Sequence, residues 1–220
     1  MNKQWSEVDH YITHHLIKED ATLEEVLEAN KAAGLPAVDV APNQAKFLYI
    51  LALIKGAKRI LEIGTLGGYS TIWLAKALPK DGKLLTLEYN PKHVEVATAN
   101  ITNAGVADLV DIITGPALDT LSSLYYNESS KFDLIFIDAD KENNAEYLKW
   151  AIKLSKKGTV IIGDNVVRKG EVTNSSSSDR KVQGIRRYYE ALGQTPNLIS
   201  TAIQTVGEKG YDGFSIGVVK

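Results

Sequence analysis

Two acidic clusters follow two apolar runs in the second half of this 220-residue chain. Asp138-Ala139-Asp140-Lys141 comes directly after residues 134–137, and Asp164-Asn165 comes directly after residues 160–163. If both runs are strands of a parallel sheet, their carboxyl ends meet at the edge where such sheets bind ligands. Asp138, Asp164 and Asn165 then offer three hard oxygen ligands, which suit Mg²⁺, Ca²⁺ or Mn²⁺. The alternative is that these side chains only cap the helices that follow.

Lys141 is the candidate general base of this cluster, because it lies three residues after Asp138. A lysine that is shielded from water beside a dication can lose its proton and accept one from a substrate. The alternative is an ordinary surface lysine, which is the usual state of this residue type.

A glycine-rich segment, residues 59–70, indicates a nucleotide-like ligand at the same edge. It has the pattern of a buried strand, a turn with Gly64, Gly67 and Gly68, and a helix that begins near Ser70. Glu62 lies near the end of the first strand, and Glu88 ends the next one, where α/β folds place a ribose-binding carboxylate. Because position 66 is Leu, the spacing is not the dinucleotide fingerprint, which argues against a nicotinamide dehydrogenase. A tight turn without a ligand remains the alternative.

The elements that must position these residues alternate between strand and helix after residue 58. Strands are predicted at 60–63, 83–88, 110–114, 134–137 and 159–162, with helices at 70–78, 91–103, 142–154 and 182–192 and a short helix after Ala117. This alternation predicts a parallel sheet with right-handed crossovers. Two last strands, 197–206 and 213–219, are expected to form an antiparallel hairpin joined by residues 207–212. Helices are predicted at 5–17, 21–33 and 42–56, and residues 174–180 form a serine-rich polar loop.

Composition narrows the class of protein. A net charge of −2 and an isoelectric point near 6.1 give no general electrostatic reason to bind nucleic acid or an anionic membrane. The chain has no cysteine, and it contains neither a signal-peptide pattern nor an apolar run that could span a bilayer, so a cytoplasmic location is expected. His10 and His14 have a spacing that can bind a metal, but no third ligand lies near them in the sequence.

These motifs together resemble the cation-dependent class I S-adenosylmethionine O-methyltransferases, which include catechol and caffeoyl-CoA O-methyltransferases. The matching pieces appear in the family's order and are residues 61–70, Glu88, Gly115-Pro116-Ala117, residues 137–141, residues 163–166 and residues 210–213. The resemblance implies one domain with a Rossmann-like fold and a mostly parallel sheet of seven strands, with helices on both faces and a C-terminal antiparallel hairpin. Residues 1–37 would be an N-terminal helical cap, and residues 38–220 the core.

The same resemblance implies a role for individual residues. Those that would contact S-adenosylmethionine are Val40, Glu62, Gly64, Thr65, Ser70, Glu88, Ala117, Asp138 and Asp140. Asp138, Asp164 and Asn165 would hold the metal, most simply Mg²⁺, and Lys141 would be the general base. Lys169 and Tyr211 would contact the substrate, with Tyr69 and Trp73 as further candidates to pack against its ring. The sequence departs from the plant enzymes at Lys169, where they have Asn, and at Arg168, where an aromatic residue is common.

The predicted function is methyl transfer from S-adenosylmethionine to a hydroxyl of a catechol-type molecule, such as a caffeoyl or flavonoid compound, in a homodimeric enzyme. One alternative is a tRNA-modifying methyltransferase acting on a hydroxylated base, for which the basic residues Arg180, Lys181, Arg186 and Arg187 are the only local support. A third interpretation, a non-catalytic cofactor-binding protein, does not account for the metal ligands and Lys141.

Overall fold

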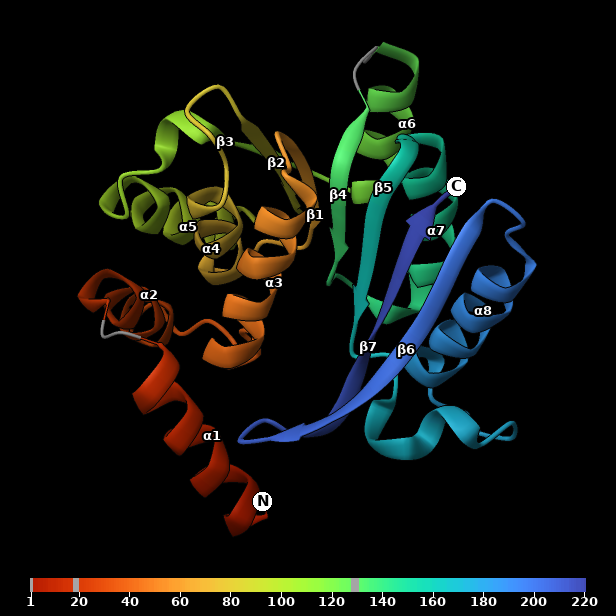
Figure 1. Ribbon diagram of the computed structural model, residues 1–220, viewed down its shortest axis with the longest axis horizontal. Coiled ribbons are helices and arrows are strands. Elements are labelled where there is room, and N and C mark those ends of the chain that lie inside the picture. Colours follow the sequence, from red (N-terminus) through yellow and green to blue (C-terminus); the bar gives the residue numbers. More distant parts are fainter. Residues whose placement is uncertain (1, 18–19, 128–130) are drawn as a thin grey trace.

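The computed structural model describes residues 2–17, 20–127 and 131–220, and within them one sheet of seven strands runs through the molecule (Figure 1). The strands are β1 (Arg59–Ile63), β2 (Lys83–Glu88), β3 (Val110–Thr114), β4 (Phe132–Ile137), β5 (Ser155–Asp164), β6 (Leu198–Gly207) and β7 (Gly210–Val219). Their order is β3-β2-β1-β4-β5-β7-β6. The first five are parallel, and β7 is antiparallel to both β5 and β6. The predicted fold class is confirmed.

Helices cover both faces of this sheet. One layer contains α3 (Pro42–Lys55), α4 (Tyr69–Lys76) and α5 (Pro91–Asn103), and the other contains α6 (Ala117–Asn127), α7 (Asn144–Lys153) and α8 (Arg180–Gln194). Successive residues of a strand point to opposite faces, so Ile60 packs into the first layer and Leu61 into the second. Because both faces are covered, the central strands are mostly apolar and buried, and the few polar residues within them, such as Glu62 and Thr86, are buried as well.

The ends of several helices are encoded locally. Pro42 and Pro91 occupy the first turn of α3 and α5, where the missing N–H costs no hydrogen bond. The side chain of Asn90 accepts a hydrogen bond from the N–H of Lys92 and caps α5. Gly56 ends α3 with a left-handed backbone, the common glycine cap. These signals explain why the predicted boundaries of the two helices are close to the observed ones.

Two further helices, α1 (Lys3–Leu16) and α2 (Ala21–Ala32), precede the sheet. Helix α2 packs against α4 and α5, whereas α1 extends away from the body and meets the β6–β7 hairpin (Figure 1). Buried Asp9 makes this contact, because its carboxylate accepts hydrogen bonds from the N–H of Glu208 (2.7 Å) and from Asn43 Nδ2 (2.8 Å). The first helix is thereby tied to the end of the chain and to the start of α3.

Some boundaries differ from the prediction. The hairpin turn contains Glu208 and Lys209, because Gly207 already pairs with Gly210. Gly210 has a positive φ of +99°, the kind of backbone that glycine adopts without strain directly after a turn. Strand β5 begins at Ser155 and not at residue 159. The described residues also form short 3₁₀ helices, which are η1 (Ala107–Leu109), η2 (Lys141–Asn143) and η3 (Arg168–Thr173). Across the described residues, no helix has the length and apolar character needed to cross a membrane.

Candidate active site

A cavity of about 850 Å³ opens at the carboxyl edge of the parallel strands. Residues that follow each of β1 to β5 line it, together with the segment that leads into α3. The chain order reverses between the adjacent strands β1 and β4, and such a switch point is where open α/β sheets form their ligand crevice. The topology thus brings both predicted groups of functional residues, the glycine turn and the acidic clusters, to one cavity.

The glycine turn after β1 is shaped by very close backbone contacts. A Cβ atom at Gly64 would lie 2.5 Å from the carbonyl oxygen of Asp138, and Gly64 has a φ of +101°, so no other residue fits. Leu66, at the position where the dinucleotide fingerprint has glycine, nevertheless adopts a left-handed φ of +51°. The N–H groups of Thr65 (3.2 Å) and Leu66 (2.9 Å) both donate to Glu88 Oε2. These contacts join the ends of β1, β2 and β4.

Glu88 lies at the end of β2 and lines the cavity, as predicted for a ribose-binding carboxylate. Its Oε1 accepts the N–H of Asn90 (2.9 Å) and faces His93 Nδ1 at 3.3 Å. Further along, Ala117 is the first residue of α6, so its backbone lies at a helix N-terminus that faces the cavity. Val40, Thr65 and Ser70 also line the cavity.

Glu62 lies beneath the cavity and does not line it, which differs from its predicted place beside the cofactor. Its carboxylate is fully buried and accepts hydrogen bonds from the hydroxyls of Ser70 (2.6 Å), Thr71 and Thr86 (2.7 Å). Burial raises the pKa of Glu62 to about 7, against the effect of these three donors. Because the Ser70 hydroxyl donates its proton to Glu62, it can offer a ligand in the cavity only its lone pairs as hydrogen-bond acceptors.

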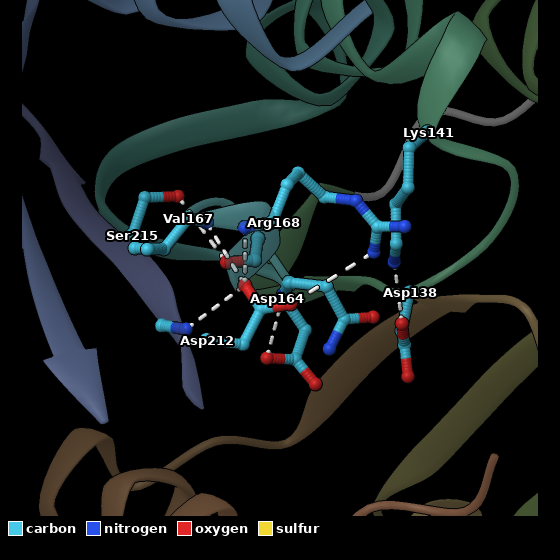
Figure 2. Close-up of polar contacts among 10 residues, drawn as sticks. Asp138, Lys141, Asp164, Val167, Arg168, Asp212 and Ser215 are labelled. Carbon is cyan, nitrogen blue, oxygen red and sulfur yellow. Dashed lines mark hydrogen bonds and ion pairs between the residues drawn. The ribbon is translucent and has the colours of Figure 1, made fainter. Parts of the chain in front are cut away.

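The acidic clusters lie side by side after β4 and β5 (Figure 2). Lys141 Nζ is 2.6 Å from Asp138 Oδ1, and its side chain is only 8% exposed. Gly184 of α8 packs against the backbone of Lys141, since a Cβ there would lie 2.2 Å from the Lys141 carbonyl oxygen. Helix α8 therefore holds the lysine in place from behind.

Asp164 is buried next to Asp138, and this has an electrostatic consequence. Burial first, and then the negative charge of Asp138, raise the pKa of Asp164 to about 7, although the charge of Lys141 opposes the shift. Asn165 follows with a left-handed φ of +55°, and its N–H donates to Asp164 Oδ1 (2.8 Å). Two carboxylates that share one lysine retain excess negative charge, which a cation would neutralise.

This donor set fits a hard divalent cation. Asp138 and Asn165 line the cavity, and Asp164 lies directly behind Asn165. In the described part of the chain, no three His, Cys, Asp or Glu side chains gather into a metal-binding group, and the oxygen donors at this place are the two carboxylates and the amide of Asn165. Carboxylate and amide oxygens are ligands that Mg²⁺ and Ca²⁺ accept, with water or substrate in the other positions. The histidine pair His10 and His14 lies outside the cavity.

Asp140 also lines the cavity and is held by its own helix. Its carboxylate accepts hydrogen bonds from Asn143 Nδ2 (2.6 Å) and from the hydroxyl of Tyr147, and burial raises the pKa of Tyr147 far above its usual value. Asn143 and Tyr147 line the cavity too. Sequence analysis missed both as site residues, because Tyr147 had the spacing of a core-facing helix position.

The predicted substrate residues Lys169 and Tyr211 are outside the cavity lining. Lys169 is exposed, and the Tyr211 hydroxyl donates to Gln204 across the hairpin. Among the other aromatic candidates, Tyr69 lines the cavity, while Trp73 is buried in the core with its ring against Tyr49. Of the predicted aromatic side chains, Tyr69 is therefore the one that can contact a ligand directly.

A buried amide network behind the glycine turn was not anticipated. Asn100 Nδ2 donates to the carbonyl of Gly67 (2.8 Å) and to Asn30 Oδ1 (2.9 Å), and Asn30 Nδ2 donates to Asp39 Oδ1 (2.8 Å). Asp39 lines the cavity, where burial raises its pKa. The network links α2 and α5 to the turn, so the N-terminal helices support the cavity directly. No sequence signal joins residues so far apart.

Comparison with known proteins decides the family. The family model described as O-methyltransferase matches residues 13–211. The chain belongs to the O-methyltransferase family. It is 49% identical, over the full length of both chains, to a catechol O-methyltransferase of Niastella koreensis. The structure of a Bacillus cereus O-methyltransferase in complex with S-adenosylhomocysteine has 56% identity and a TM-score of 0.98 over the full length of both chains. That of a Streptomyces achromogenes O-methyltransferase involved in tomaymycin synthesis, in complex with S-adenosylmethionine, has 45% identity and a TM-score of 0.96, again over both full chains.

Membership confirms the predicted family and enzyme class, and this O-methyltransferase uses S-adenosylmethionine as its cofactor. The size and lining of the cavity suit that assignment. About 850 Å³ is within the range of small-molecule sites. The cavity combines a glycine turn, a strand-end carboxylate and helix N-termini at one end with the acid–lysine cluster at the other.

Proposed function

We propose that this methyltransferase transfers a methyl group to one hydroxyl of a vicinal dihydroxy aromatic molecule in a reaction that requires a divalent cation. The observation that carries the proposal is the juxtaposition of Asp138, Lys141 and Asn165 in the lining of the cofactor cavity, with Asp164 behind them. Three oxygen donors and one desolvated amine suit the binding and deprotonation of a diol. The name of the Niastella koreensis relative, catechol O-methyltransferase, supports this class of acceptor.

The cofactor would occupy the end of the cavity formed by the glycine turn and Glu88. Glu88 would accept hydrogen bonds from the ribose hydroxyls, and the backbone N–H of Ala117 would meet the adenine. Val40, Gly64, Thr65 and Ser70 would line the methionine end, with Asp138 and Asp140 beside it. Glu62 would act through Ser70, because it orients that hydroxyl without reaching the cavity. S-adenosylmethionine supplies an electrophilic methyl carbon on a positively charged sulfur.

The acceptor would bind at the other end. Asp138, Asp164 and Asn165 would hold a divalent cation, most simply Mg²⁺, whose positive charge makes a bound hydroxyl more acidic. Lys141 would act as the neutral amine and accept the hydroxyl proton at Nζ, becoming an ammonium that Asp138, at 2.6 Å, can stabilise. The packing of Gly184 against the Lys141 backbone holds this residue beside the donor set. The resulting oxygen anion forms the new bond to the methyl carbon as the carbon–sulfur bond breaks. The protein contributes mainly position and the placement of charge.

Methyl transfer from labelled S-adenosylmethionine to caffeic acid, measured with Mg²⁺ and again with EDTA, tests this proposal. We expect turnover with Mg²⁺ and a loss of at least about a hundred-fold with EDTA, because the diol then lacks the charge that acidifies it. Re-addition of Mg²⁺ should restore the rate, which controls for inactivation by the chelator. Equal turnover under both conditions would contradict the role of the metal. Cofactor binding without any turnover would contradict the proposed acceptor class.

The comparisons and the structure do not favour the RNA-modifying alternative. Two of the basic residues that motivated it make hydrogen bonds within the protein. Arg186 donates to the carbonyl of Val172 (2.8 Å), and Arg187 donates to the carbonyl of Glu142 (3.1 Å). Both guanidinium groups thus take part in contacts of α8 with neighbouring segments of this chain.

We also infer that the enzyme is a homodimer. Strand β6 is at the edge of the sheet. On the face that β6 and β7 turn toward α3, Ile199 and Ile203 of β6 and Val218 of β7 are 64%, 50% and 41% exposed. Exposed Ile54 and Phe47 of α3 lie on the same side, where Phe47 packs on Phe214 of β7. An apolar surface at an unpaired edge is unfavourable in water unless another chain covers it, and a second copy is the simplest partner.

Light scattering coupled to size-exclusion chromatography tests the dimer. The wild-type protein should have twice the mass of the 24.1 kDa chain, and Ile203→Glu should shift it to the monomer because a carboxylate cannot be buried unpaired at the interface. Thr98→Glu, which places a carboxylate at an exposed polar position of α5 near the opposite edge of the sheet, is the matched control. A wild-type protein that is monomeric at all concentrations tested would contradict the inference.

A further inference from the structure

Arg168 lies at the acceptor end of the cavity and has no role in the mechanism above. It follows Asn165 by three residues and lines the cavity together with Asp138 and Lys141. In Figure 2 its side chain extends from the backbone near Asp212 toward Lys141. Its ion pair is with Asp212, at 3.8 Å, and not with either of the two acids proposed to hold the metal. The cavity therefore contains a cation that the proposed chemistry does not use.

The backbone around Arg168 is strained in a way that fixes this orientation. Arg168 and Lys169 both have left-handed φ values, +54° and +56°, which residues other than glycine rarely adopt. Asp212 Oδ1 holds the segment by accepting the N–H groups of Val167 (2.9 Å) and Arg168 (3.0 Å). Strain that the surrounding structure maintains at a cavity is characteristic of functional positions.

The guanidinium of Arg168 has unused hydrogen-bonding capacity. Its Nε atom is buried from solvent and has no hydrogen-bond partner among the described residues. The 3.8 Å between Nη1 and Asp212 Oδ2 exceeds hydrogen-bonding distance, so this pair contributes attraction but no hydrogen bond. The Arg168 side chain is 26% exposed and lines the cavity, so its terminal N–H groups can reach a ligand there, whereas the buried Nε cannot. Among the described residues, Nη1 has the distant Asp212 carboxylate as its ion-pair partner, and a ligand anion in the cavity would give these groups an acceptor.

We propose that Arg168 binds a carboxylate of the acceptor, so that the preferred substrates are vicinal dihydroxy aromatic acids. This inference rests on the proposed function, because it places the acid group on the same molecule as the diol. The guanidinium presents a planar fork of N–H donors that matches a carboxylate, and it always carries its charge. Lys181, which also lines the cavity, adds positive charge on the same side of the sheet. Neutral catechols would leave the Arg168 donors unpaired and should be poorer acceptors.

Matched acids and esters test this inference. We would measure kcat/KM for 3,4-dihydroxybenzoate against its methyl ester, and for caffeate against its methyl ester, so that each pair differs in the acid group and shares the diol. The wild-type enzyme should prefer the acid at least about ten-fold in one of the two pairs, the size expected for one charge-assisted hydrogen bond. Titration of the same four compounds into the enzyme bound to S-adenosylhomocysteine should show the same order of affinity without turnover.

Variants of Arg168 separate recognition from stability. Arg168→Gln should reduce the acid-to-ester ratio to about one by slowing the acid alone, and Arg168→Lys should restore part of the preference because it returns the charge without the fork. Lys157→Gln removes an exposed charge at the opposite end of β5 and should leave the ratio unchanged. A purely structural role for Arg168 would lower the rates of acid and ester together.

The outcomes also separate this inference from the proposed function. Wild-type enzyme that methylates acids and esters equally well in both pairs would overturn the role of Arg168 and leave the catechol activity intact. A preference for the acids that survives in Arg168→Gln would overturn it as well. Wild-type enzyme that methylates none of the four compounds would overturn the proposed function itself.

Discussion

Asp138→Ala is expected to abolish metal-dependent methyl transfer, with kcat/KM falling by about a thousand-fold or more. The change removes one of the two proposed carboxylate ligands and also the 2.6 Å partner of Lys141. The fold should persist, because the contact that Asp138 makes with the sheet, its N–H to the carbonyl of Ile63 (2.9 Å), belongs to the backbone. The decisive measurement combines the rate with caffeate and the affinity for Mn²⁺ from its electron paramagnetic resonance signal, which needs no turnover.

A control variant and a cofactor-binding measurement accompany the Asp138→Ala experiment. Asp108→Ala, which removes an exposed carboxylate outside the cavity, should leave the rate and Mn²⁺ binding unchanged. S-adenosylhomocysteine should still bind to Asp138→Ala, because the glycine turn and Glu88 are intact. Full activity of Asp138→Ala with a catechol acceptor would remove this residue from the metal site.

Lys141→Met is expected to lower kcat by about a hundred- to ten-thousand-fold, the usual contribution of a positioned general base. Methionine fills a similar volume under Gly184 but cannot accept a proton, so affinity for the cofactor should change little. Lys141→Arg provides the sharper comparison. It keeps a positive charge for Asp138, but arginine does not deprotonate in proteins, so it should be as inactive as Lys141→Met.

The pH dependence of these variants distinguishes a base from a structural lysine. If solvent must take the proton in place of Lys141, the residual rate should rise with hydroxide concentration, and the wild-type rate should rise less steeply over the same range. Lys149 is an exposed lysine that pairs with Glu146 of the same helix, α7, so the control variant Lys149→Met should behave as wild type. A neutral-pH rate for Lys141→Met equal to that of wild type would exclude Lys141 from the chemistry.

Local signals in the sequence were sufficient for most of the fold. The buried strands are mostly apolar runs, and prolines such as Pro42 and Pro91 begin helices where their geometry is already suitable. Strict strand–helix alternation then leaves few topologies, because parallel crossovers are right-handed. The hairpin turn was predicted too long because a turn with glycines at both ends, Gly207 and Gly210, allows pairing to continue closer to the tip than composition suggests.

The residues of the candidate site were also mostly visible in the sequence. The carboxyl ends of parallel strands share an edge, so Glu88, Asp138 and Asp164 had to meet once the strands were identified. The proposed metal ligands and Lys141 belong to two short motifs, residues 138–141 and 164–165, which the pairing of β4 with β5 brings together. For this reason the family resemblance could be stated before the structure.

Only the tertiary structure decided which of these side chains reach the cavity. It places Glu62 beneath the floor of the cavity. Successive side chains of a strand point to opposite faces of the sheet, and α4 covers the face to which Glu62 points. The tertiary structure joins Asn30, Asn100 and Gly67 across distances in sequence that no local pattern spans. It also turns Arg168 into the cavity through a strained backbone held by Asp212, 44 residues later. The sequence by itself determined the chemistry available at the sheet edge, since that depends on residue types at strand ends, whereas orientation and burial depend on long-range packing.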